Sequence, residues 1–371
     1  MCCLVFVVFS LISVSQNLPE AIFIVSSMAL VFLASVSSVF LYTGNYAILS
    51  TLPKPFSQAI SLGQGTAGMI TCIAKLITIK IFQENLHAPP TGLVHRAPTD
   101  SDSFLYFFFT ALLLFFSSLS FFFYMKYSSS IFKPKAYHII DEKDVKYFRQ
   151  GASYSPPDPF DHAALGPSKS RGKCSLFELC SIVSSKNSSV RCLWWCNFIV
   201  CFQTMFLFPS WPQMTKSTDP SYSEPVNGQF FTIFVLLLFN VGDWFGRIIL
   251  SFPAMFIHVD RLLFLVSLLR FLHVPLYLFG NVDFGGHHLN PLPKLLASDY
   301  IVMANTLLFG VSSGYLTTLF LIEAPNRVSN NLFKIRVSFY MLLGLVLSVA
   351  LGSIASLVLK IVLLSYGGSH K

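Results

Sequence analysis

Charged residues are scarce in this chain. Asp, Glu, Lys and Arg make up 11% of its 371 residues, whereas hydrophobic residues make up 54% and the mean hydropathy is +0.64. An ordinary soluble domain carries about 25% charged residues. The composition therefore excludes a soluble interaction protein and indicates a polytopic membrane protein in a lipid bilayer.

Motifs of catalysis and of metal binding are missing as well. The chain has no His-Glu-x-x-His motif, and no serine–histidine pair or aspartate pair lies at membrane depth. Its eight cysteines suggest no disulfide framework, and Cys192-x3-Cys196 is one face of an apolar helix rather than a zinc site. We therefore expect neither an enzyme nor a metal or cofactor.

Apolar runs of about 18 residues or more predict membrane spans. An all-α polytopic membrane helix bundle follows, because the chain has one short apolar run at 1–16 and eight full runs. The full runs are 20–44, 57–82, 104–125, 192–211, 229–252, 261–280, 299–322 and 335–364.

The net charge of +8 does not indicate a nucleic-acid partner, because the basic residues lie mostly between the apolar runs. The polar segment 126–189 is rich in lysine and arginine, and cytoplasmic loops carry such an excess. We expect this segment to be a disordered cytoplasmic loop, with the C-terminus outside and the plasma membrane rather than an internal membrane as the location.

The run 229–252 carries an acid and a base near its middle, where each charge costs about 2.5–3.5 kcal/mol. Asp243 and Arg247 are four residues apart, so a helix places them on one face within reach of each other. Trp244 adds aromatic surface, and Asn240 lies on the same face. The pair could bind a polar substrate, or it could be a buried ion pair that only locks two helices.

The stretch Phe239-Asn240-x-x-Asp243-Trp244-x-Gly246-Arg247 resembles a motif of the equilibrative nucleoside transporter family. Further stretches resemble motifs of that family in the same order. They are Pro53, Gly63-Gln64-Gly65-x-Ala67-Gly68, Phe208-Pro209, Arg270-x3-Val274-Pro275-Leu276 with Asn281, and Ser313-Gly314-Tyr315-Leu316.

The resemblance implies a major-facilitator-like architecture of two bundles, and facilitative transport of nucleosides, with nucleobases as possible further substrates, by alternating access in a monomer. The family has eleven spans, and counting back from the large loop identifies about nine of them here. We therefore expect an N-terminal bundle at 1–125 that lacks the first two spans, the loop at 126–189, and a C-terminal bundle of five spans at 190–371. The alternative is a truncated, non-transporting membrane protein or an incomplete gene model.

The resemblance also implies roles for single residues. Asp243 and Arg247 would contact ribose hydroxyls, and Asn240 could bind a ribose or base edge or form an interhelical hydrogen bond instead. Tyr42 stands where many members have a glutamine that meets the nucleoside, and Trp244 could stack on the base.

Other residues of the spans are expected to be structural or gating. Gln64 lies early in the span 57–82, whose small residues would let helix backbones approach closely, and Glu323 ends a span as an interface or gate charge. The remaining members of this structural group are Gly63, Gly65, Gly68, Arg270 and Pro275.

Overall fold

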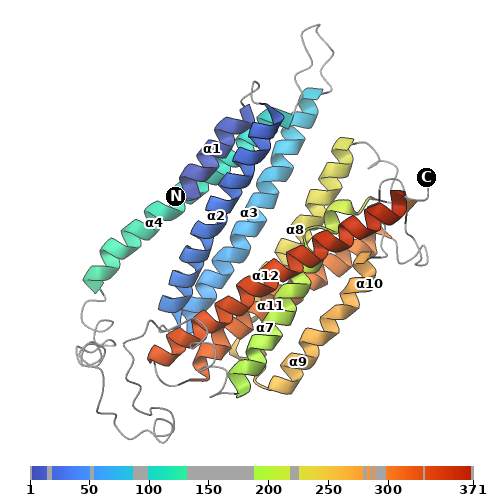
Figure 1. Ribbon diagram of the computed structural model, residues 1–371. Helices are drawn as coiled ribbons and strands as arrows, with labels where there is room; N and C mark the ends of the chain where they lie inside the picture. Colours follow the sequence, from blue (N-terminus) through green and yellow to red (C-terminus); the bar gives the residue numbers. More distant parts are fainter. Residues whose placement is uncertain are drawn as a thin grey trace, which may run out of the picture.

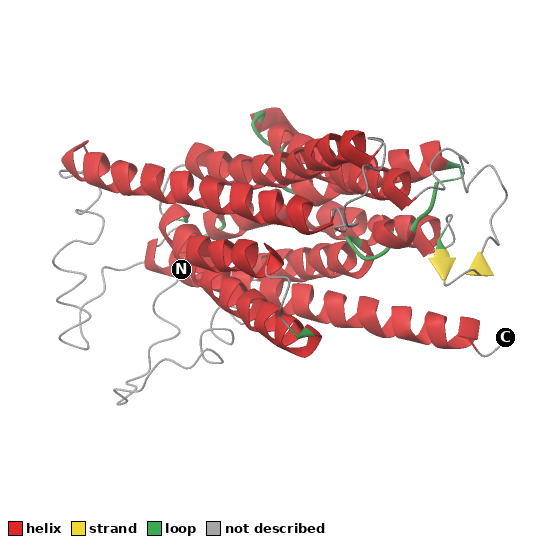
Figure 2. Cartoon of the chain, turned by 90° about the horizontal axis from the view of Figure 1, so that it is seen from above, coloured by secondary structure: helices red, strands yellow, loops and turns green. Residues whose placement is uncertain are grey.

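Helices make up nearly all of the chain that the computed structural model describes (Figures 1 and 2). The described residues are 2–14, 19–50, 54–86, 99–131, 188–217, 225–278, 282–284, 287–288, 298–328 and 331–368. Within them, one antiparallel ribbon joins β1 (Asp283–Phe284) to β2 (His287–His288). A helix satisfies its backbone hydrogen bonds internally, as a segment that crosses a bilayer must.

The first four helices form one group, which lies on one side of the molecule in Figure 1. They are α1 (Cys2–Val14), α2 (Glu20–Leu49), α3 (Lys54–Leu86) and α4 (Thr99–Ile131). Helix α1 packs against α4 and α2, and α3 packs against α4. The expected loop at 126–189 lies outside the described residues, apart from the end of α4 and the first two residues of α7.

The second group is built around helix α11. Its members are α7 (Ser188–Leu207), α8 (Pro225–Ile249), α9 (Asp260–Leu269), α10 (His273–Leu278), α11 (Asp299–Asn326) and α12 (Asn331–Gly368), with the short 3-10 turns η2 (Pro212–Met214), η4 (Pro253–Met255) and η5 (Arg270–Leu272). Helix α11 packs against α7, α8 and α12, and its residues Leu316, Leu319 and Phe320 are fully buried.

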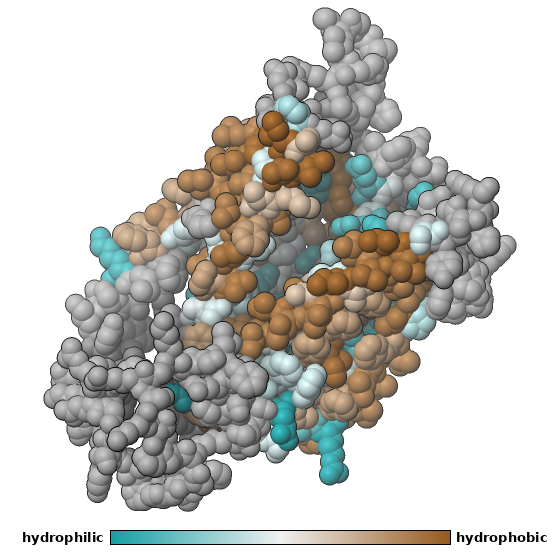
Figure 3. All heavy atoms as spheres, viewed as in Figure 1, coloured by the Kyte–Doolittle hydropathy of each residue, from teal (hydrophilic) through white to brown (hydrophobic). Residues whose placement is uncertain are grey.

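Seven helices in the described residues are long and apolar enough to cross a membrane. The remaining expected span, 104–125, lies inside the 33-residue helix α4, whose described apolar part is Phe107–Ser120. Apolar side chains cover most of the helix surface in Figure 3. Met28, Phe32 and Phe40 of α2, for example, are each more than 60% exposed, as side chains that contact lipid would be. These findings confirm an all-α multi-pass membrane bundle.

The span expected at 261–280 is interrupted rather than continuous. The α-helical pattern of α9 gives way to η5 at Arg270–Leu272 before α10 begins. Pro275 follows, and it has no N–H to donate to the carbonyl of Phe271 four residues earlier. Residues Asp260–Leu278 are nevertheless long and apolar enough to cross a membrane, as expected, and Pro275 is the sequence feature that marks the irregularity.

One face of α3 joins the two groups. Gln58, Ser61, Gly65, Gly68 and Cys72 recur every three or four residues, so they form one stripe along the helix. Ser61 and Cys72 form hydrogen bonds to α8, the two glycines pack closely against it, and Gln58 donates to the carbonyl of Leu250, directly after its last residue. Helix α3 also touches α11, and α2 touches α12.

Candidate functional site

Four glycines bring α8 and α11 into backbone contact. A Cβ atom added to Gly242 or Gly246 would collide with the backbone of α11, and one added to Gly310 or Gly314 would collide with the backbone of α8. Small residues allow this kind of close approach between membrane helices. Because Gly314 meets the backbone of Asp243 itself, α11 fixes both the position and the rotation of the acidic residue.

Asp243 and Arg247 form the ion pair that their spacing predicts. Arg247 Nε donates to Asp243 Oδ2 at 2.7 Å. The Arg247 side chain is only 14% exposed and the Asp243 side chain only 12% exposed. A charge held this far from water is costly unless it is paired and hydrogen-bonded. The pairing therefore stabilises both charges inside the bundle.

Arg247 also reaches across to α3. Its Nη1 donates to the backbone oxygen of Ser61 at 3.0 Å and to Gln64 Oε1 at 3.1 Å. Asp243, Ser61 and Gln64 thus hold Nε and Nη1, two of the three nitrogens of the planar guanidinium group. The contacts connect the two helix groups at a charged residue.

The remaining side of the ion pair has unused hydrogen-bonding capacity. Among the described residues, no hydrogen bond is formed by Arg247 Nη2, which carries two N–H donors, or by Asp243 Oδ1, which is an acceptor. A buried site that offers donors and an acceptor side by side suits a ligand with neighbouring hydroxyl groups, because a hydroxyl both donates and accepts.

Tyr42 joins the site through Gln64. The Tyr42 hydroxyl donates to Gln64 Oε1 at 2.9 Å, and the Tyr42 ring packs against the Tyr46 ring with 4.9 Å between centroids. Tyr42 comes from α2, Gln64 from α3 and Arg247 from α8. The structure therefore brings together a predicted substrate contact, a predicted gating residue and the predicted ion pair.

Trp244 and Asn240, both predicted to bind substrate, form hydrogen bonds to α3. Trp244 Nε1 donates to Thr66 Oγ1 at 3.1 Å, and Asn240 Nδ2 approaches Cys72 Sγ at 3.3 Å while also donating to the Leu236 carbonyl. The interhelical bond is the alternative that the sequence left open for Asn240. A substrate contact by either residue stays a prediction.

The glycines of α3 differ in their surroundings. A Cβ at Gly65 would lie 3.2 Å from both Arg247 Cδ and Trp244 Cα, and one at Gly68 would collide with the Asn240 amide. Nothing lies within 4 Å of a Cβ at Gly63. Gly65 and Gly68 therefore allow α8 to lie close to α3, whereas Gly63 takes no part in this contact.

Arg270 is buried in the second group, with 2% exposure. In the described residues its hydrogen-bond partners are neutral oxygens of α7 and α11, and its guanidinium carbon lies 4.4 Å from the centre of the Phe309 ring. These partners are Ser312 Oγ, Thr204 Oγ1 and the carbonyls of Val200 and Phe309. The contacts agree with a structural role, in which Arg270 holds η5 against both helices.

Glu323 lies in a charge cluster at the end of α11. Its Oε1 is 3.2 Å from both Arg327 Nε and His258 Nδ1, and its Oε2 is 3.6 Å from Lys54 Nζ. Arg327 also pairs with Asp260 at 3.2 Å. Lys54 is the one member of this cluster from the first helix group, so the bridge between Lys54 and Glu323 spans the two groups.

The sequence places Glu323 at the end of a span near Arg327, but it did not reveal the rest of this cluster. Lys54 and His258 are far from Glu323 in the sequence, and no spacing rule connects residues on different helices. The only available signal was that Lys54, His258 and Glu323 all lie near ends of spans on the same expected side of the membrane.

Comparison with known proteins places the chain among transporters. Residues 27–361 match the family model described as "Nucleoside transporter". Equilibrative nucleoside transporter 2 of Rattus norvegicus is 25% identical over 347 residues, which is 90% of this chain and 72% of the relative. The Mus musculus protein of the same name is 26% identical over 358 residues, with the same coverage.

A shorter part of the chain is more similar to a human relative. Equilibrative nucleoside transporter 2 of Homo sapiens is 36% identical over 155 residues, which cover 40% of this chain and 32% of that protein. The family match, by contrast, extends over most of the chain and includes both helix groups. With its multi-pass helical fold and its buried acid–base pair, the chain belongs to the nucleoside transporter family.

Proposed function

We propose that this chain moves nucleosides, and nucleobases as possible further substrates, across a membrane by facilitated transport. The family and the names of the relatives support this substrate class. In this proposal, Asp243 and Arg247 contact the ribose. Trp244 and Asn240 line the same face of α8, where the Trp244 ring could contact the base.

The observation that carries the proposal is the free side of the ion pair. Arg247 Nη2 can donate two hydrogen bonds to ribose oxygens, and Asp243 Oδ1 can accept a hydrogen bond from a ribose hydroxyl, so adjacent ribose hydroxyls would find both kinds of partner. Hydrogen bonds to charged groups contribute about 1.5–3 kcal/mol each. A single contact of that strength would distinguish a ribose from a sugar without hydroxyls.

The two helix groups fit an alternating-access mechanism, in which two bundles rock around a site at mid-membrane. We assign 1–125 and 190–371 to these bundles and 126–189 to a cytoplasmic loop between them, with the C-terminus outside. The plasma membrane is the proposed location and a monomer the proposed state. The α3–α8 contact lies where such bundles would meet, beside Asp243 and Arg247.

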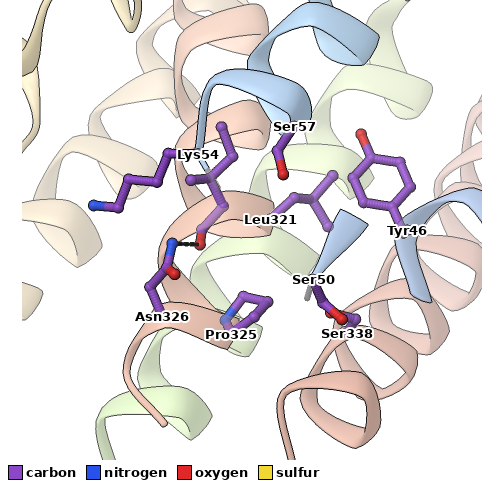
Figure 4. A pocket seen from close by; sticks show the side chains of 9 residues that line it. Tyr46, Ser50, Lys54, Ser57, Leu321, Pro325, Asn326 and Ser338 are labelled. Atoms are coloured by element: carbon purple, nitrogen blue, oxygen red, sulfur yellow. Dashed lines mark hydrogen bonds between the residues drawn. The ribbon is translucent and has the colours of Figure 1, made fainter. Parts of the chain in front are cut away.

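A small cavity lies between the two helix groups beside Lys54 of the Glu323 cluster. The cavity has a volume of about 10 Å³, which is about the space that one water molecule needs. Tyr46, Ser50, Lys54 and Ser57 line it from the first helix group (Figure 4). Leu321, Ile322, Pro325, Asn326 and Ser338 line it from the second group. A nucleoside could not pass, so we propose that this end is the closed cytoplasmic gate.

The proposed function is tested by uptake in cells that lack their own nucleoside transport. Cells that express this chain are expected to take up labelled adenosine or inosine faster than cells with an empty vector, with saturation at high substrate concentration. An excess of unlabelled nucleoside should compete, whereas free ribose should compete poorly. Uptake no faster than in empty-vector cells, with the protein present in the membrane, would count against transport.

Reversing the charge of Lys54 is expected to open the cytoplasmic gate more often. The Lys54 side chain is 44% exposed, and bridges of this kind contribute about 0–1 kcal/mol, so the closed state is only modestly stabilised. Lys54→Glu replaces that attraction with repulsion. A cysteine introduced at Ser57, which lines the cavity, should then react roughly fivefold faster with an impermeant thiol reagent in inside-out vesicles.

Two further variants serve as controls for the gate experiment. Lys54→Gln removes the bridge without repulsion, so it should raise the labelling rate less than Lys54→Glu does. Arg261→Glu reverses an exposed charge at the start of α9 and should leave the rate unchanged. An unchanged rate in Lys54→Glu would show that the bridge does not hold this end closed.

A further inference from the structure

Gln64 connects two residues that come from different helix groups. Its Oε1 accepts the Tyr42 hydroxyl at 2.9 Å and Arg247 Nη1 at 3.1 Å. An amide oxygen has two lone pairs, so it can accept both bonds at once. Since an arginine can only donate, Gln64 must present its oxygen to Arg247, and its amide nitrogen points elsewhere.

These bonds fix the orientation of the guanidinium group. Nε is held by Asp243 and Nη1 by Ser61 and Gln64, so the plane of the group is defined from two helices. A free arginine side chain has about 2 kcal/mol of rotamer entropy, which a ligand would otherwise have to overcome. A binding site performs best when neighbouring residues hold its contact groups in place beforehand.

We infer that Gln64 is a positioning residue for Arg247, and that Tyr42 holds Gln64 in turn. The inference rests on the proposed function, because it concerns how Arg247 presents Nη2 to ribose. Tyr42 then influences ribose recognition through Gln64, from the position where many family members have a glutamine. The chain of contacts runs from Tyr42 on α2, through Gln64 on α3, to Arg247 on α8.

A purely structural role for Gln64 makes a different prediction. If Gln64 only held α3 against α8, its loss would impair every substrate alike. If it orients Arg247, its loss should impair substrates that have ribose hydroxyls and spare those without them. Adenosine and 2′,3′-dideoxyadenosine share a base and differ in these hydroxyls, so their uptake separates the two roles.

The test measures KM and maximal rate for both substrates in cells that express each variant. Gln64→Leu removes the acceptor and should raise the KM for adenosine about tenfold, since a bond to a charged group is lost. The KM for 2′,3′-dideoxyadenosine should change less than about twofold. Gln64→Glu keeps an oxygen that can accept both bonds and should restore most of the preference for adenosine.

A matched control lies on the same helix. Gln58→Leu makes the same replacement in α3 and also removes one interhelical hydrogen bond, from Gln58 to the carbonyl of Leu250 just after α8, but in the described residues Gln58 forms no hydrogen bond with Arg247. It should leave the KM ratio of the two substrates unchanged. Tyr42→Phe removes the bond that holds Gln64 and should shift the ratio in the same direction as Gln64→Leu, by about twofold to threefold.

The possible outcomes are distinct. Equal KM increases for both substrates in Gln64→Leu, or the same shift in Gln58→Leu, would overturn the positioning role while leaving transport in place. If Gln64→Leu fails to reach the membrane, Tyr42→Phe decides, and an unchanged ratio there overturns the inference. A wild-type chain that takes up neither substrate would contradict the proposed function and the inference with it.

Discussion

Replacing Arg247 with alanine is expected to lower nucleoside uptake at least about a hundredfold. The variant loses the proposed ribose donor, and a hydrogen bond to a charged group contributes about 1.5–3 kcal/mol. It also leaves the Asp243 carboxylate buried without its partner, and breaking a buried pair in this way costs about 3–5 kcal/mol. Both effects act on the same site, so the initial rate of adenosine uptake per molecule at the membrane should fall sharply.

Graded substitutions separate charge from geometry in this prediction. Arg247→Lys keeps the positive charge but loses the planar guanidinium group that binds Asp243, Ser61 and Gln64 at once. It should therefore recover only a small part of the uptake rate. Arg261→Ala removes an exposed arginine of α9 and should leave uptake within about twofold of wild type. Wild-type uptake by Arg247→Ala, at equal membrane abundance, would rule out the proposed ribose contact.

Gly314→Ala is expected to have the largest effect on stability. The added Cβ would meet the backbone oxygen of Asp243, which cannot rotate out of the way as a side chain could. Helices α8 and α11 would have to separate, and overpacking of this kind costs about 1–3 kcal/mol or more. The melting temperature in detergent should fall and uptake should be lost, because Asp243 moves with its backbone.

Gly44 provides the matched control for this substitution. It lies on α2, where nothing is within 4 Å of an added Cβ. Alanine favours a helix over glycine by about 1 kcal/mol in either position. Gly44→Ala should therefore be neutral or slightly stabilising in the same melting experiment. A similar melting temperature for the two variants would mean that the contact between α8 and α11 is looser than described.

The sequence was sufficient to predict the ion pair but not its surroundings. Asp243 and Arg247 are four residues apart on one helix, so local geometry alone brings them together, and the 2.7 Å distance confirms it. The contact between Gln64 and Arg247 joins residues 183 positions apart. No periodicity within one helix predicts which face of another helix it meets.

The small residues also show that a sequence does not reveal which helices pack together. In the sequence, Gly242 directly precedes Asp243 and Gly246 directly precedes Arg247. Their purpose appears only when Gly310 and Gly314 of α11 are seen against them. Many helices of a membrane protein carry small residues, so composition alone does not determine which two of them pair.

The charge cluster around Glu323 was predictable only in part. Glu323 was expected as an interface or gate charge at the end of a span, and the structure pairs it with Arg327, four residues later, at 3.2 Å. The bridge from Lys54 to Glu323 depends on how the two helix groups meet. It is therefore the feature most directly tied to the proposed gate, and the one that sequence patterns could not supply.

Flux into liposomes that contain only the purified chain tests the central proposal most directly. Labelled adenosine should enter faster than into empty liposomes and level off when the inner and outer concentrations are equal, as facilitated transport requires. Preloading with unlabelled adenosine should speed the entry of label through exchange. Entry no faster than into empty liposomes, from protein that remains folded in the bilayer, would contradict the account.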